Sequence, residues 1–436
     1  MRTALAALLL ALPASPAAAQ ANPNNDAWSY QNGRPAYRSP DGDFTIAFRA
    51  RLQIDAATYF EDGADAVPHL NGGVAPRRFY LGFEGSLFTR LQYEFRMDFE
   101  NAERILDAPL VNLARLSYDA GEGQTHLRFN AGIIKPIFSL DDATSSASLL
   151  FLERAMAVNA ATAGFGGGTA RLGIETLYQH TGVFGTDDNF AFSAALTGPA
   201  TPGVNRGTHL LGRAVYGFKP QEDSILQFGV DAAQSLDSGN TGRTLALQDF
   251  PEIRIDGRDL VGTGPLAARH SLMLGGEAAA MVRNFYLAGE YYGYAVELPA
   301  ATAHFSGWYL QGAWIVTGET RTYLPYAFNN NISTFANLRV SHPFDWSAGT
   351  WGAFEVAARY STLDLNWRAG APGSVCTICV RGGEEKNWSF ALNWYPNDNM
   401  RLMLDYTIAD VDRLGAAGQS SGRHFTALGT RLQLTN

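Results

Sequence analysis

Apolar and polar residues alternate one by one along much of this chain. The alternation is clearest in residues 44–60, 91–100, 126–133 and 400–408, where every second position is apolar and nearly all positions between are polar or charged. Successive side chains of a β-strand point to opposite faces, so each segment predicts a strand with one apolar face and one polar or charged face. Such a strand suits a barrel wall that separates lipid from water.

The connections between these segments alternate in length. Short turns at 88–90 and 395–399 contrast with long connections at 61–75, 235–268 and 365–385, and we expect the short turns to face the periplasm. A soluble β-sandwich also alternates along its strands and remains an alternative. Many segments of about ten residues or more, with aromatic residues near their ends, are typical of a transmembrane barrel.

About seventeen segments can be distinguished, of which 174–184 and 333–341 are the weakest. Bacterial single-chain barrels have an even number of strands, so we predict an all-β fold, a transmembrane antiparallel β-barrel of about 16 strands. No separate domain is indicated, and residues 21–436 are expected to form a single barrel domain.

The first twenty residues predict export. Arg2 precedes the short apolar run 4–12, and small residues at 17–19 offer a cleavage site, so residues 1–20 are expected to be a signal peptide. A membrane anchor is the alternative, but about ten apolar residues are too few to span a bilayer, which takes about twenty. No apolar stretch of eighteen residues follows, so any membrane crossing must use strands, and we expect the bacterial outer membrane.

One connection differs from the others. From residue 135 to residue 168 the alternation stops, 141–146 supplies helix-capping residue types, and 149–155 has a helix-like pattern. We predict that this segment folds into the barrel as a constriction loop, because a loop can narrow a barrel lumen. The fold would bring Lys135 and Arg154 to the narrowest level. A mobile outer loop is the alternative.

Arginine dominates the basic residues. Of 33 Lys and Arg, 30 are Arg, and the lysines are Lys135, Lys219 and Lys386. Guanidinium groups stay charged when partly desolvated and bind oxyanions in a planar fork, which suits an anion path. GC-rich codon usage would explain the excess equally well.

Four arginines share the polar phase of neighbouring segments: Arg49, Arg51, Arg78 and Arg96. Stacked along a lumen, they would form a ladder on which an anion exchanges partners. The alternative is that they pair with acidic residues of the same face, which are Asp55, Glu84, Glu94, Asp98 and Glu100. That pairing would leave Arg51 and Arg78 more available to anions than Arg96.

Acidic residues outnumber basic ones. The chain has 42 Asp and Glu against 33 Lys and Arg, and loss of residues 1–20 removes one Arg, which leaves 32 against 42 and a net charge of −10. Nucleic acid is therefore not an expected partner.

Catalytic motifs are absent from the sequence. There is no G-x-S-x-G elbow and no H-E-x-x-H helix, and the glycine-rich segment 164–168 lacks the Lys-Ser/Thr of a P-loop. Cys376 and Cys379 predict a small disulfide loop, since no other Cys or closely spaced His completes a metal site and a redox C-x-x-C belongs to a βαβ context. We expect no catalytic site, metal or cofactor, and no enzyme activity.

Several sequence blocks follow one another in a characteristic order. They are 132–140 (GIIKPIFSL) with 144–146 (TSS) and 151–154 (FLER), then 76–84, 307–319, 351–361 and 381–397. Together they cover nearly the whole chain after residue 20 and resemble the phosphate-selective porins O and P. The ordered combination is more specific than any single block.

The resemblance implies a sixteen-stranded trimeric barrel with an inward loop, an arginine ladder and a loop lysine that together hold phosphate. By position, Arg51, Arg77 and Arg78 correspond to ladder residues. Lys135 opens the loop signature, and Arg154 belongs to the Glu-Arg pair that closes it.

Three features depart from a regular barrel strand or from the family pattern. Arg77 is in phase with the outward Phe79, so it needs a β-bulge or a rim position to face the lumen. Where relatives tend to carry closely spaced arginines before a Pro-Glu, this chain has QDFPE at 248–252 and only Arg254 and Arg258 nearby, which predicts a depleted ladder. The last strand, ending at 431–436, lacks the terminal aromatic residue usual in barrel proteins.

These observations predict an outer-membrane porin for passive diffusion of small anions, phosphate or polyphosphate in particular. The residues expected to border the path are Arg49, Arg51, Arg77, Arg78, Lys135 and Arg154. A general non-selective diffusion porin is the main alternative, and an outer-membrane enzyme or adhesin is a third. Expected partners are phosphate or other small anions, outer-membrane lipid and lipopolysaccharide, and, from the resemblance alone, two further copies in a homotrimer.

Overall fold

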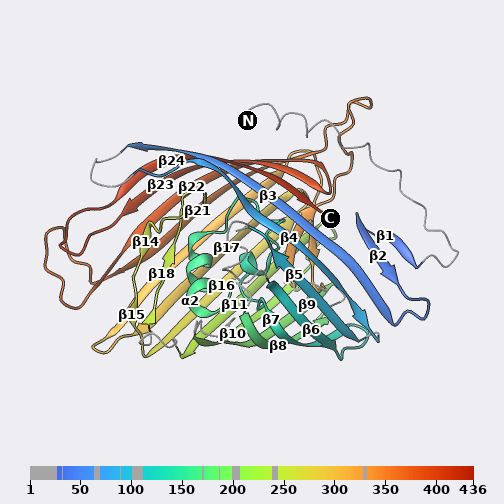
Figure 1. The fold of residues 1–436 in the computed structure, drawn as a ribbon, viewed down its shortest axis with the longest axis horizontal. Coiled ribbons are helices and arrows are strands. Elements are labelled where there is room, and N and C mark those ends of the chain that lie inside the picture. Colours follow the sequence, from blue (N-terminus) through green and yellow to red (C-terminus); the bar gives the residue numbers. More distant parts are fainter. Residues whose placement is uncertain are drawn as a thin grey trace.

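The strands of the chain close into a barrel. The computed structural model describes residues 27–31, 33–62, 69–88, 90–100, 111–168, 171–185, 187–198, 207–237, 244–327 and 331–436, so the predicted signal peptide lies outside the described residues. Eighteen strands form the main antiparallel sheet, and sixteen of them close on themselves because β24 (Arg423–Thr435) pairs with β3 (Phe44–Asp62). Figure 1 shows these strands strongly tilted around an occupied interior. The predicted sixteen-stranded antiparallel barrel is confirmed.

The barrel strands between β3 and β24 follow the chain in order. They are β4 (Gly73–Leu87), β5 (Leu91–Asp98), β6 (Val111–Asp119), β7 (Thr125–Ile134), β8 (Arg171–Thr181), β9 (Asp188–Thr197), β10 (Thr208–Phe218), β11 (Ser224–Asp237), β16 (His270–Val282), β17 (Phe285–Glu297), β18 (Thr302–Ile315), β21 (Ala353–Trp367), β22 (Val380–Asn397) and β23 (Met400–Asp412).

The smaller elements lie at the rim and inside the barrel. At the rim, β1 (Trp28–Gln31) and β2 (Arg34–Arg38) form a hairpin that joins the start of β3. The interior elements are three two-stranded sheets and two helices: β12 (Thr244–Leu245) with β15 (Leu266–Ala267), β13 (Gln248–Asp249) with β14 (Val261–Gly262), β19 (Arg321–Leu324) with β20 (Thr334–Leu338), α1 (Leu140–Ala143) and α2 (Met156–Phe165). Neither described helix is long and apolar enough to cross a membrane.

The alternation in the sequence becomes the two faces of the wall. In β17, Phe285, Leu287 and Tyr291 are exposed on the outside, whereas Glu290 and Tyr292 are buried on the inside. Since the outer face presents large apolar side chains strand after strand, the wall is suited to lipid.

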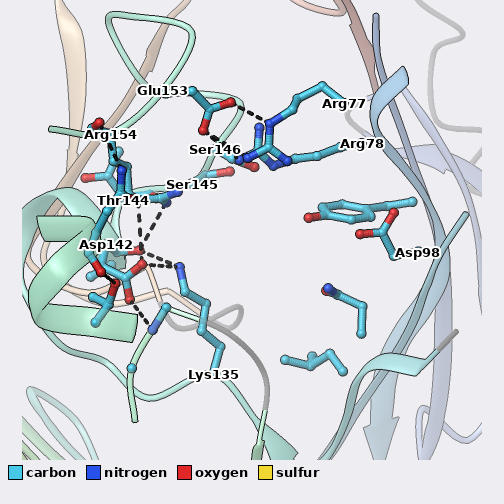
Figure 2. Close-up of a pocket in the computed structure, with 18 of the residues that line it drawn as sticks. Arg77, Arg78, Asp98, Lys135, Asp142, Thr144, Ser145, Ser146, Glu153 and Arg154 are labelled. Carbon is cyan, nitrogen blue, oxygen red and sulfur yellow. Dashed lines mark hydrogen bonds and ion pairs between the residues drawn. The ribbon is translucent and has the colours of Figure 1, made fainter. Parts of the chain in front are cut away.

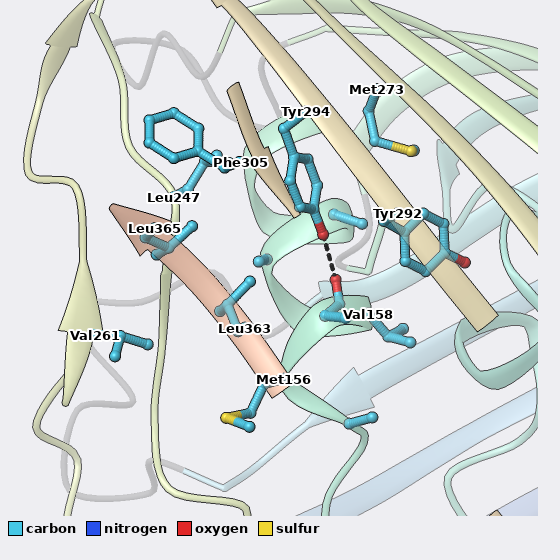
Figure 3. Packing of buried hydrophobic residues seen from close by; sticks show 14 of the residues in the cluster. Met156, Val158, Leu247, Val261, Met273, Tyr292, Tyr294, Phe305, Leu363 and Leu365 are labelled. Carbon is cyan, nitrogen blue, oxygen red and sulfur yellow. Dashed lines mark hydrogen bonds between the residues drawn. The ribbon is translucent and has the colours of Figure 1, made fainter. Parts of the chain in front are cut away.

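Three segments fill part of the lumen. The first is the constriction loop (residues 135–168), the second is a segment we call the lumen loop (residues 244–269), and the third is the connection from β18 to β21, which contains β19 and β20. Inward apolar residues of the wall, among them Phe305 and Leu363, pack around α2 (Figure 3), and the Tyr294 hydroxyl donates a hydrogen bond to the Ala157 carbonyl at 2.7 Å.

The β19–β20 hairpin explains the odd segment count. The weak segment 174–184 overlaps β8, which is a strand of the barrel wall. The segment 333–341 overlaps β20, which pairs with β19 in a separate two-stranded sheet. Removing 333–341 from the wall turns the predicted seventeen segments into sixteen. The predicted disulfide loop is also confirmed, since Cys376 is bonded to Cys379 between β21 and β22.

The helix in the constriction loop begins later than predicted. The helix-like run 149–155 is not helical, and α2 starts at Met156. Main-chain carbonyls of this run accept hydrogen bonds from guanidinium groups of the wall. They therefore do not need the hydrogen bonds that a helix would supply from the amides four residues later. The pairs are Arg401 with Leu149 at 2.6 Å, Arg431 with Leu152 at 2.6 Å and Arg359 with Glu153 at 3.0 Å.

Candidate anion-binding site

A cavity of 450 Å³ lies between the constriction loop, the lumen loop and the wall formed by β3 to β6. Nine basic and six acidic side chains line it. All six predicted path residues are among them: Arg49, Arg51, Arg77, Arg78, Lys135 and Arg154. Figure 2 shows Arg77 and Arg78 on the wall side, opposite Asp142 and Arg154 of the loop, with Lys135 reaching into the space between them.

Arg51 and Arg96 are the wall arginines with neutral partners. Arg51 donates to the hydroxyl groups of Ser146 at 2.6 Å and Ser145 at 3.0 Å, and Arg96 donates to the side-chain oxygen of Asn112 at 2.8 Å. Neither forms an ion pair with a carboxylate of the described residues. The alternative in which Arg96 pairs directly with an acidic neighbour is therefore not seen among the described residues, although Glu94 interacts with Arg96 electrostatically at longer range.

Arg77 reaches the lumen through a β-bulge. In the pairing of β3 with β4, Gln53 lies opposite Arg78 and Ile54 lies opposite Pro76, so Arg77 is the extra residue. The bulge turns both arginines toward the constriction loop. This is the β-bulge that the alternation predicted as one way for Arg77 to face the lumen.

A carboxylate of the constriction loop occupies these two arginines. Glu153 pairs with Arg77 in a fork, with oxygen-to-nitrogen distances of 2.5 and 2.9 Å, and lies 3.7 Å from Arg78. Burial works against the charged form of Glu153, but the two guanidinium groups hold its pKa well below the usual value. Arg77 is therefore largely neutralised, and Arg78, which also donates to Gln53 at 3.0 Å, is partly so.

Lys135 and Arg154 meet at Asp142 on the loop side. The Lys135 ammonium lies 3.0 Å from an Asp142 carboxylate oxygen, and the Arg154 guanidinium lies 3.6 Å from the same oxygen. Arg154 also donates to the main-chain carbonyls of Asp141 and Thr144, so it braces the loop. Burial lowers the pKa of Lys135 to about 8, although Asp142 acts in the opposite direction.

Arg49 is paired with carboxylates of the wall. Its guanidinium lies 3.1 Å from Glu84 and 3.4 Å from Glu94. The alternative in which part of the ladder is neutralised therefore holds for Arg49 and Arg77, but not for Arg51.

The sequence identified Arg254 as an arginine remaining near the depleted ladder segment, but it did not predict that the lumen loop folds into the barrel and lines the cavity. Arg254 reaches the cavity from that loop and stacks on Phe250, with 4.0 Å between the guanidinium carbon and the ring centre. The apolar residues Leu245, Leu247 and Ile253 predict a buried face. All three pack in the apolar cluster around α2 inside the barrel. The local sequence does not show that this apolar face packs inside the lumen.

One group of carboxylates is close enough to hold a metal ion, as far as the described residues go. Oxygen atoms of Asp231, Glu277 and Glu290 lie within 4.8 Å of one another. Glu277 is paired with Arg213 at 2.7 Å, and Glu290 accepts hydrogen bonds from the amides of Leu140 and Asp141 and from two tyrosines. The group therefore anchors the start of α1 to the wall.

Comparison with known proteins identifies a family and a relative of this chain. A family model described as phosphate-selective porin O and P matches residues 46–435. An uncharacterized protein of Caulobacter vibrioides is 29% identical over 406 residues, which cover 91% of this chain and 73% of that protein.

Two solved structures support the fold. An anion-selective porin from Comamonas acidovorans has a TM-score of 0.52 at 11% identity and covers 90% of this chain and 100% of its own. The trimer form of in-vitro folded OmpT, an outer membrane protein of Vibrio cholerae, has a TM-score of 0.51 at 9% identity and covers 90% and 99%. At these identities the likeness concerns the barrel alone.

Proposed function

Because the chain belongs to the phosphate-selective porin O and P family and is a channel of the bacterial outer membrane, we propose that it conducts small anions and binds phosphate in the cavity. The family and the fold indicate a channel rather than an enzyme. The observation that carries the proposal is the pair Arg51 and Arg96, whose described partners are neutral hydroxyl and amide groups.

The chemistry of the cavity suits a tetrahedral oxyanion. Guanidinium groups supply charge-assisted hydrogen bonds, and the hydroxyl groups of Ser145 and Ser146 add neutral donors that can rotate toward an oxygen. Binding shared among several such groups lets an anion pass from one set to the next. We further propose that three copies assemble as a homotrimer, in keeping with the family resemblance and the trimer form of one structural neighbour.

The first test removes the two arginines. In planar bilayers, Arg51→Ala and Arg96→Ala should each raise the phosphate concentration that half-blocks chloride current by about tenfold or more, because a hydrogen bond to a charged group contributes about 1.5–3 kcal/mol. Arg90→Ala, in the exposed pair with Glu122 at a short turn, is the matched control and should leave block unchanged.

Two outcomes would contradict the proposal. Reversal potentials in a KCl gradient that show cation preference in the unsubstituted channel would exclude an anion path. Conductance that phosphate does not block would favour the general diffusion porin, which the six acidic residues of the lining allow.

The second test uses pH. Since the pKa of Lys135 is lowered to about 8, its ammonium is charged below that pH and loses the charge as pH rises through it. We expect the anion-to-cation permeability ratio, measured in KCl, to fall by about fivefold between pH 7 and pH 9, since one charge at about 4 Å in water is worth about 1 kcal/mol. Lys135→Arg keeps its charge over this range and should abolish the change. A ratio that falls equally in Lys135→Arg would assign the titration to another group.

A further inference from the structure

We propose that the cavity prefers anions that carry a compact aromatic group, such as an aryl phosphate, over anions of equal charge without one. This inference rests on the proposed anion function and adds the chemical class of the ligand. It follows from the unequal sides of the cavity, because one side carries several arginines and the other carries the ring of Phe250.

The cationic side is the wall. Arg51 and Arg96 both lie over the ring of Tyr80, with 5.7 and 4.8 Å between guanidinium carbon and ring centre. Tyr80 stands on β4, between the β3 strand of Arg51 and the β5 strand of Arg96, so its ring contacts both guanidinium groups. Ser145 and Ser146 close the same side through their hydrogen bonds with Arg51. A phosphoryl group placed here meets positive charge and neutral donors together.

The other side is the tip of the lumen loop. Phe250 and Pro251 line the cavity, and the Arg254 guanidinium stacks on the Phe250 ring. The lumen loop brings only this one basic residue to the lining, together with Gln248 and Asp249. An anion without a ring can use only the Arg254 guanidinium on this side, whereas an aryl phosphate can also stack its ring on Phe250 or on the arginine.

The segment that carries Phe250 is held in place by contacts with the wall. Buried Glu252, next to Pro251, accepts hydrogen bonds from Arg359 at 2.6 Å and Ser361 at 2.6 Å. The Tyr59 hydroxyl donates to the Ile253 carbonyl at 2.7 Å. Because the chain just after Phe250 is fixed to the wall at two points, a ligand ring binds there with little ordering cost.

The size of the cavity is consistent with an organic anion. At 450 Å³ it falls within the range of about 300–1,000 Å³ that is usual for pockets binding small organic molecules. An inorganic phosphate would bind at the arginines and leave the Phe250 side to water.

The experiment compares two probes of equal charge. Phenyl phosphate and methyl phosphate are added to single channels in planar bilayers with 0.1 M KCl at pH 7.4. We expect phenyl phosphate to half-block chloride current at about one tenth of the methyl phosphate concentration, a ratio that corresponds to about 1.4 kcal/mol. Inorganic phosphate, measured beside them, reports on the proposed function by itself.

Substitutions locate the ring site. Phe250→Ala should bring the ratio between the two probes close to one, and Phe250→Tyr, which keeps a ring, should retain it. If Phe250→Ala does not assemble, Phe250→Leu replaces it and should lower the ratio to about three or less. Phe184→Ala, at an exposed turn between β8 and β9, is the matched control and should keep the tenfold ratio.

The results separate the two proposals. A ratio near one in the unsubstituted channel, with inorganic phosphate still blocking, overturns the aromatic preference and leaves the anion function standing. A tenfold ratio that persists in Phe250→Ala or Phe250→Leu overturns the assignment to the lumen loop. Absence of block by all three phosphates, with cation-selective reversal potentials, overturns the proposed function and this inference with it.

Discussion

Glu153→Gln should raise both the anion-to-cation permeability ratio and the affinity for phosphate by about tenfold, which corresponds to about 1.4 kcal/mol. The carboxylate of Glu153 pairs with Arg77 in a fork and lies 3.7 Å from Arg78 and 3.2 Å from Arg431. Glutamine keeps the shape and one acceptor oxygen but removes the charge, so Arg77 and Arg78 become available to a passing anion. Removing a single charge near a protein surface changes the interaction with a monovalent ion by about 1–4 kcal/mol.

The measurement is the reversal potential in a KCl gradient together with the phosphate concentration that half-blocks chloride current. Glu122→Gln, whose side chain is exposed at a turn and pairs with Arg90, is the matched control and should change neither quantity. A permeability ratio that is unchanged or lower in Glu153→Gln would show that Glu153 does not compete with anions for the two arginines.

Period-two patterns predicted the wall because each barrel strand meets lipid on one side and the lumen on the other. Strands β3, β5 and β23 follow the segments found in the sequence closely, since their inward faces remain polar. The pattern also located Arg51 and Arg78 on the inward face. It identified the need for a bulge at Arg77, because two successive residues cannot point to the same side of a regular strand.

The lumen segments were harder to predict because their partners are distant in sequence. The run 149–155 has helical composition, but Arg359, Arg401 and Arg431 bind its carbonyls and keep it extended. Those arginines stand on β21, β23 and β24, so the local sequence carries no sign of them. Residues 333–341, which contain β20, resemble a wall strand because a strand that pairs inside a barrel has the same local pattern as one that pairs within its wall.

Charge pairing could be anticipated as a possibility but not assigned. Arg49, Arg51 and Arg96 share one phase, yet among these three only Arg49 forms ion pairs with carboxylates in the described structure. Whether an arginine meets a carboxylate or a serine depends on which part of the constriction loop faces it. The register between that loop and the wall comes from tertiary contacts such as the one between Leu152 and Asp405.

Arg431→Met should destabilise the barrel by about 3–5 kcal/mol, because breaking a buried ion pair leaves the remaining charge unpaired. Both guanidinium and carboxylate are buried: Arg431 forms a fork with Asp55, with both distances 2.6 Å, and a third nitrogen donates to the Leu152 carbonyl at 2.6 Å. The substitution therefore also releases one anchor of the constriction loop, and single-channel conductance should rise.

The double variant Asp55→Leu/Arg431→Met removes both charges, so its stability in urea titrations of the refolded barrel should recover by about 2 kcal/mol or more relative to the single variant. Its conductance should stay high, since the Leu152 anchor is still missing. A single variant that unfolds at the same urea concentration as the unsubstituted barrel would show that the Arg431–Asp55 pair does not stabilise the fold. A normal conductance in both variants would show that the loop is held by its other contacts alone.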